Sequence, residues 1–78
     1  MTLEQLLNQT LCFIDVKIDG EFKELNENKN QDGFYQVKDS ELLFAPIANI
    51  SQDFNGVITM PDITGKSFEI KLINGKVL

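Results

Sequence analysis

The chain contains no histidine, no arginine and no tryptophan, and only one cysteine among its 78 residues. Histidine is the commonest general base and metal ligand in proteins, so its absence excludes Ser-His-Asp triads, Cys-His pairs and histidine-containing zinc sites within one chain. A single cysteine cannot form an intrachain disulfide, so nothing indicates an oxidising compartment. Any catalysis would have to use carboxylates, lysine, hydroxyl groups or Cys12.

Positive charge is also scarce. Twelve acidic residues against seven lysines give a net charge of −5. Proteins that bind nucleic acids neutralise phosphates with clustered cations and favour the bidentate guanidinium of arginine, so direct binding of DNA or RNA is not expected. Anionic membrane surfaces are disfavoured for the same reason.

Long apolar segments are missing as well. No run approaches the roughly 20 apolar residues that a membrane-spanning helix needs. Residues 1–14 carry Glu4 where a secretory leader would carry lysine or arginine. We therefore expect residues 1–78 to form one cytoplasmic domain with a thin core, whose net stability is about 3–5 kcal/mol.

The hydrophobic pattern predicts a short helix and then a strand. Thr2 and Gln5 have the spacing of a capping box, and a helix is expected from about Leu3 to Asn8. From Cys12 the period changes to two, with Cys12, Ile14, Val16 and Ile18 on one face and Phe13, Asp15 and Lys17 on the other. This alternation is typical of a half-buried strand.

Four of the five glycines follow Asp or Asn, a pattern that favours tight hairpin turns. For the first hairpin we prefer a three-residue loop that ends at Gly20. This loop would pair Lys17 with Glu21 and Val16 with Phe22, whereas a two-residue loop would set Val16 against Lys23.

Further strands are expected at 34–38, 42–45, 57–60 and 67–73, with a short last strand at 76–78. The fold class that follows is mainly β: a short N-terminal helix and then a small antiparallel β-barrel or two-layer β roll of six to seven strands.

Three short motifs resemble functional loops without completing them. The segment 15–20 has the glycine of a calcium loop, but Lys17 occupies a ligand position. Gly65-Lys66-Ser67 ends like a phosphate-binding loop but lacks its first glycine, and Asp62-Ile63-Thr64-Gly65 is best explained as a turn. Cys12 lies in an apolar stretch and is expected in the core. We therefore expect a non-enzymatic protein with no metal or cofactor.

The segment Leu42–Ala48 is apolar at both its odd-numbered and its even-numbered positions, so both faces of this strand must be covered. The covering could come from the protein itself, from a partner protein or from a second copy, and the sequence leaves these alternatives open. If a partner covers the segment, the contact residues are Leu42, Leu43, Phe44 and Ile47.

Charge divides unevenly along the chain, because three of the seven lysines lie in residues 63–78 with only one acidic residue. The acidic remainder could attract a basic partner, and Asp15, Glu21 and Glu24 are its candidate contacts. The sequence thus favours a non-enzymatic protein-binding module, in its specific form a small acidic inhibitor or adaptor of the phage or mobile-element type. The alternative is a structural subunit that self-assembles through the apolar strand.

Overall fold

A computed structural model describes residues 1–9 and 12–74 of the chain. These residues form one helix and seven strands: α1 (Leu3–Gln9), β1 (Cys12–Ile18), β2 (Glu21–Glu24), β3 (Tyr35–Gln36), β4 (Leu43–Phe44), β5 (Ser51–Gln52), β6 (Ile58–Pro61) and β7 (Ser67–Asn74). The protein is mainly β, as the sequence predicted.

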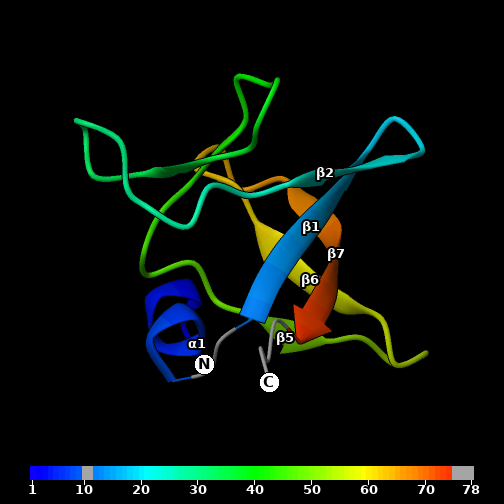
Figure 1. Ribbon diagram of the computed structural model, residues 1–78. Coiled ribbons are helices and arrows are strands. Elements are labelled where there is room, and N and C mark those ends of the chain that lie inside the picture. The colour runs from blue at the N-terminus through cyan, green and yellow to red at the C-terminus, as the bar shows by residue number, and fades with distance from the viewer. Residues whose placement is uncertain (10–11, 75–78) are drawn as a thin grey trace.

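Five of the strands form an antiparallel sheet in the order β2-β1-β7-β6-β5, while β3 and β4 pair in a separate two-stranded sheet (Figure 1). The long central strands β1 and β7 pair from Cys12–Asn74 to Val16–Ile70. Strands β2 and β5 are the edges, so the described strands form an open sheet and do not close into a barrel, which was one of the two predicted architectures.

The helix begins with the predicted capping box. The Thr2 backbone amide donates to Gln5 Oε1 at 3.0 Å, and the Gln5 amide donates to Thr2 Oγ1 at 3.2 Å. Leu3 is buried, with Leu6 and Leu7 packed against the core beside it. The helix lies near the end of the sheet at which β1 begins (Figure 1), and it covers part of the core face there.

The first hairpin differs from the prediction. Its loop has two residues, and Ile18 pairs with Glu21 and Val16 with Lys23. Asp19 and Gly20 both have positive φ, at 50° and 84°, as a two-residue type I′ turn requires. This register sets Leu25 against Ile14, where the Leu25 amide donates to the Ile14 carbonyl, and Leu25 is buried.

The observed register places the charged residue Lys23 on the core face of β2, opposite Val16. Lys23 is half-buried, and its Nζ donates to the Asp39 carbonyl at 3.3 Å. A lysine can cover apolar surface with its methylene stem while its ammonium stays near water. The twist of the type I′ turn and the burial of Leu25 therefore decide the register.

The core lies between the inner face of the sheet and a layer made by α1, β3, β4 and the adjoining segments. Among the residues whose side chains the structure describes, ten hydrophobic residues are buried: Leu3, Ile14, Val16, Leu25, Tyr35, Val37, Phe44, Ala48, Met60 and Ile70. No polar or charged residue is buried among the residues with described side chains. The alternation predicted for 12–18 is confirmed at Ile14 and Val16, which face the core, and at Phe13 and Lys17, which are exposed.

The remaining strand predictions are confirmed in position, although β3 and β4 are shorter than 34–38 and 42–45. Strand β5 was not predicted. The strand expected at 76–78 lies outside the described residues. So does the Cys12 side chain, and its burial stays a prediction.

Candidate protein-binding pocket

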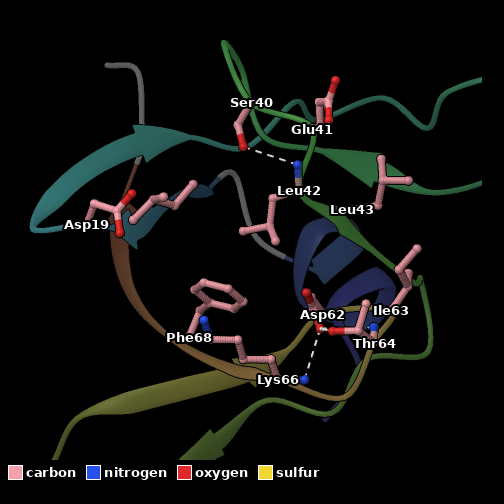
Figure 2. A pocket seen from close by; sticks show the side chains of 11 residues that line it. Asp19, Ser40, Glu41, Leu42, Leu43, Asp62, Ile63, Thr64, Lys66 and Phe68 are labelled. Carbon is pink, nitrogen blue, oxygen red and sulfur yellow. Dashed lines mark hydrogen bonds between the residues drawn. The ribbon is translucent and has the colours of Figure 1, made fainter.

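A cavity of about 530 Å³ opens at the end of the molecule where three turns meet. The β1–β2 turn contributes Asp19, the β3–β4 turn and the start of β4 contribute residues 40–43, and the β6–β7 turn contributes residues 62–64 and 66 (Figure 2). Its volume lies within the range of roughly 300–1,000 Å³ that is usual for ligand pockets.

Apolar side chains form the floor of this cavity. Ile18 and Phe68 are the residues at which the core faces of β1 and β7 reach the cavity, and Leu42 lines the cavity with them. All three are only partly buried, and Figure 2 shows Leu42 and Phe68 directed toward the central space. The Phe68 ring also packs edge-on against the buried Phe44 at a centroid distance of 6.0 Å, so the floor is continuous with the core.

Three carboxylates are among the residues that line the cavity: Asp19, Glu41 and Asp62 (Figure 2). The ion pairs found among the described residues involve other acids, namely Glu69, Glu4 and Glu24. One cation, Lys66, lines the cavity, and its Nζ lies 5.4 Å from the centroid of the Phe68 ring. These four charged residues form the rim of the cavity, which therefore carries an excess of negative charge. Among the described residues, neither Asp19 nor Glu41 has an ion-pair partner.

Hydrogen bonds fix the walls. The Leu42 amide donates to Ser40 Oγ at 3.1 Å, and the Gln36 side-chain amide donates to the Ser40 carbonyl at 2.8 Å. Across the cavity, the Ile63 amide donates to the Leu43 carbonyl at 3.1 Å. This last bond ties the β6–β7 turn to β4, so two walls that are distant in sequence are held together.

Asp62 organises the β6–β7 turn. Its Oδ1 accepts hydrogen bonds from the Thr64 hydroxyl at 2.6 Å and from the backbone amides of Thr64 and Lys66, each at 2.9 Å. Burial alone would raise the pKa of Asp62, but the bonds from Thr64, Lys66 and Gly65 outweigh it and hold the pKa below its ordinary value of 3.8. The carboxylate is therefore ionised at neutral pH and fixed in direction.

This lowered pKa predicts acid sensitivity. Because the folded state binds the Asp62 proton more weakly than the unfolded chain does, the stabilisation is present above the unfolded pKa and is lost as the pH falls through the folded pKa. Asp62→Asn should therefore be less stable than wild type at neutral pH and should lose less stability on acidification. Thr64→Val, which removes only the hydroxyl donor, should lie between the two. Urea unfolding at several pH values below 6 measures this; parallel profiles for all three proteins would contradict it.

The residues proposed from sequence as partner contacts fall on different surfaces. Leu42 and Leu43 line the cavity, whereas Phe44 is fully buried and belongs to the core. Ile47 is 80% exposed and does not line the cavity. The structure thus divides the apolar run between core, cavity and open surface.

The three acidic candidates lie elsewhere. Asp15 and Glu24 line a shallow hollow with Phe13 and Ile73 on the outer face of the sheet. Glu21 is exposed opposite Ile18 and directly follows the β1–β2 turn.

The sequence analysis missed Asp19, Glu41 and Asp62 as a set. Asp19 and Asp62 were each explained by turn chemistry, which the structure confirms. No sequence signal brings the three together, because they belong to loops that meet only when β1, β4 and β7 pack.

Within the described part of the chain, no group of three or more acidic, histidine or cysteine side chains is arranged to hold a metal ion. No helix in that part has the length and apolarity needed to cross a membrane. Comparison with known proteins finds no matching protein family, no similar curated protein and no similar solved structure. The geometry of the pocket is therefore the basis for assigning a function.

Proposed function

We propose that this protein is a non-enzymatic protein-binding module whose pocket receives an apolar side chain from a basic segment of a larger protein. The observation that carries the proposal is the apolar floor of Ile18, Leu42 and Phe68 beside the carboxylates of Asp19 and Glu41, which take part in none of the ion pairs of the described residues. In its more specific form, the proposed function is that of a small acidic inhibitor or adaptor, of the kind that phages and mobile elements encode, which occupies a basic surface of its target.

Two physical terms support this partner chemistry. Desolvation of one buried aliphatic or aromatic side chain contributes about 1.5–3 kcal/mol, which supplies affinity. Carboxylates around the entrance contribute less, about 0.2–1 kcal/mol per exposed ion pair, but they favour cationic segments and speed their association at low salt. A pocket of this kind therefore selects partners that combine an apolar anchor with lysine or arginine.

The chemistry of the rim argues for binding over catalysis. A carboxylate with a lowered pKa that accepts three hydrogen bonds at one oxygen is a weak general base. Asp62 thus serves best as a fixed negative charge.

The test compares two variants with the same change in net charge. Asp19→Asn/Glu41→Gln removes two rim charges, and asparagine keeps the positive φ that position 19 requires. Glu27→Gln/Asp32→Asn removes two exposed charges that do not line the cavity. A protein retained from the source lysate by wild type and by the second variant, but bound roughly tenfold more weakly by the first, would support the proposal.

A photo-cross-linking residue at position 43 places the contact. Cross-linking of that same retained protein at position 43, together with slower association at physiological than at low ionic strength, is the expected result. Equal loss of binding in both double variants would show that net charge alone matters, and binding that is unchanged in both would remove the pocket as the site.

A further inference from the structure

The outer face of the sheet, opposite the core, presents a ladder of exposed side chains along β1 and β7. The cross-strand pairs are Phe13 with Ile73 and Asp15 with Lys71. The next step of the ladder brings Lys17 to Glu69, and their side chains form an ion pair at 3.6 Å. Phe13 and Ile73 remain 40% and 38% exposed. Two large apolar side chains therefore lie side by side in solvent on a face that no described element covers.

Below this apolar pair, the next row carries opposite charges without an ion pair between them. Asp15 and Lys71 are directly opposite in the register. The Lys71 ammonium instead lies 5.9 Å from the centroid of the Phe22 ring, and the ion pairs of the described residues include neither Asp15 nor Lys71. One acid and one cation at the same level of the ladder therefore remain available for a partner.

This arrangement is its own complement. Consider a two-fold axis that lies above the outer face, parallel to the strands and midway between β1 and β7. This axis would place each β1 residue of one copy over its β7 partner residue in the other copy. Phe13 would then meet Ile73 of the second copy, and Asp15 would meet its Lys71. Each row is either apolar on both strands or oppositely charged, so the contacts that the axis generates between β1 of one copy and β7 of the other are favourable.

We propose that the outer face of β1 and β7 is the interface of a symmetric dimer, in which a second copy of this chain covers Phe13 and Ile73. The two sheets would pack face to face, about 10 Å apart, with strands aligned to within about 30°. A strongly basic or acidic partner fits this face less well than a second copy does, because its charges balance: Asp15 against Lys71, and Lys17 against Glu69.

The proposal goes beyond the pocket and does not depend on it. Ile18, Leu42 and Phe68 belong to the opposite, core side of the sheet, so dimerisation leaves the pocket open. An axis parallel to the strands also keeps both pockets at the same end of the dimer. Two linked pockets that face one target would raise its apparent affinity by effective concentration alone.

Complementary charge variants test the geometry. Asp15→Lys gives a chain with lysine at both positions 15 and 71, and Lys71→Asp gives a chain with aspartate at both. Each variant alone should bring like charges together across the axis and raise the dimer dissociation constant roughly tenfold or more. An equimolar mixture should recover a dimer made of one copy of each, because every charged contact between the two chains is then attractive.

Sedimentation equilibrium gives the dissociation constants, and native mass spectrometry identifies the mixed dimer when one variant is isotope-labelled. Phe13→Thr, which keeps a strand-forming residue, should abolish the dimer without a charge change. Ile47→Asp is the control, because it alters an exposed apolar residue on another surface. Ile47 belongs to the apolar segment 42–48, the alternative site of self-association. Circular dichroism verifies that each variant is folded.

A wild-type protein that stays monomeric up to millimolar concentration would overturn the proposal, as would a mixture of the two charge variants that forms no mixed dimer. Loss of the dimer in Ile47→Asp but not in Phe13→Thr would place self-association on the apolar segment instead. Failure of the lysate experiment on the pocket would leave this dimer untouched, since the two tests use different residues and different readouts.

Discussion

Phe44→Ala is expected to leave most of the protein unfolded at room temperature. The Phe44 side chain is fully buried and its ring packs edge-on against Phe68. Truncation of a buried phenylalanine costs about 3–5 kcal/mol, since it removes apolar burial and leaves a cavity. A single domain of this size has a net stability of about 3–5 kcal/mol, so this one substitution consumes nearly all of it.

Phe54→Ala is the matched control, because it makes the same chemical change at a side chain that is fully exposed. Its free energy of unfolding should stay within about 0.5 kcal/mol of wild type. Urea titration followed by circular dichroism measures both variants. Similar midpoints for the two would show that Phe44 is not a core residue and would return it to the set of candidate partner contacts.

Leu3→Ala should destabilise the protein by about 2–5 kcal/mol, although Leu3 is near the chain terminus. The side chain is fully buried. The first turn of the helix is anchored by two backbone bonds, from the Leu3 amide to the Ala48 carbonyl at 2.8 Å and from the Glu4 amide to the Pro46 carbonyl at 3.0 Å. A cavity at Leu3 therefore weakens both α1 and the segment that follows β4.

Leu72→Ala serves as its control, since Leu72 is a leucine near the end of the central strand β7 and is 37% exposed. Its loss should be clearly smaller, because less apolar area leaves the interior and the site opens to solvent. Thermal unfolding of the two variants decides the comparison. A larger effect at Leu72 than at Leu3 would mean that α1 contributes little to the core.

The apolar segment 42–48 shows where sequence reasoning reached its limit. The absence of alternation correctly indicated that several of its side chains need cover. Phe44 and Ala48 receive that cover from the core, Leu42 and Leu43 line the pocket, and Ile47 receives almost none. The short β3–β4 ladder and the turn after it decide which of these side chains is buried, lines the pocket or is exposed. The hydrophobicity of the segment does not predict these two features.

The first hairpin shows a second limit. Pairing preferences between neighbouring side chains favoured a three-residue loop, but each cross-strand pair contributes only about 0.2–1 kcal/mol. Burial of Leu25 opposite Ile14 contributes more free energy than these pairs do. Lys23, which this register places on the core side, keeps its ammonium at the surface. Extending the second strand of the hairpin to Leu25 favours the observed register, because this register places Leu25 in the core.

The features that the sequence determined by itself are local ones. The capping box of Thr2 and Gln5, the alternation along β1 and β7, and the position of the turn at Asp19-Gly20 follow from backbone geometry and side-chain chemistry within a few residues. Only the tertiary structure decided the rest: the open order of the sheet, the meeting of Asp19, Glu41 and Asp62 around one apolar floor, and the ladder of Phe13–Ile73 and Asp15–Lys71. These depend on contacts between segments far apart in the chain, and burial of the shared core, summed over many residues, sets such contacts where no local pattern specifies them.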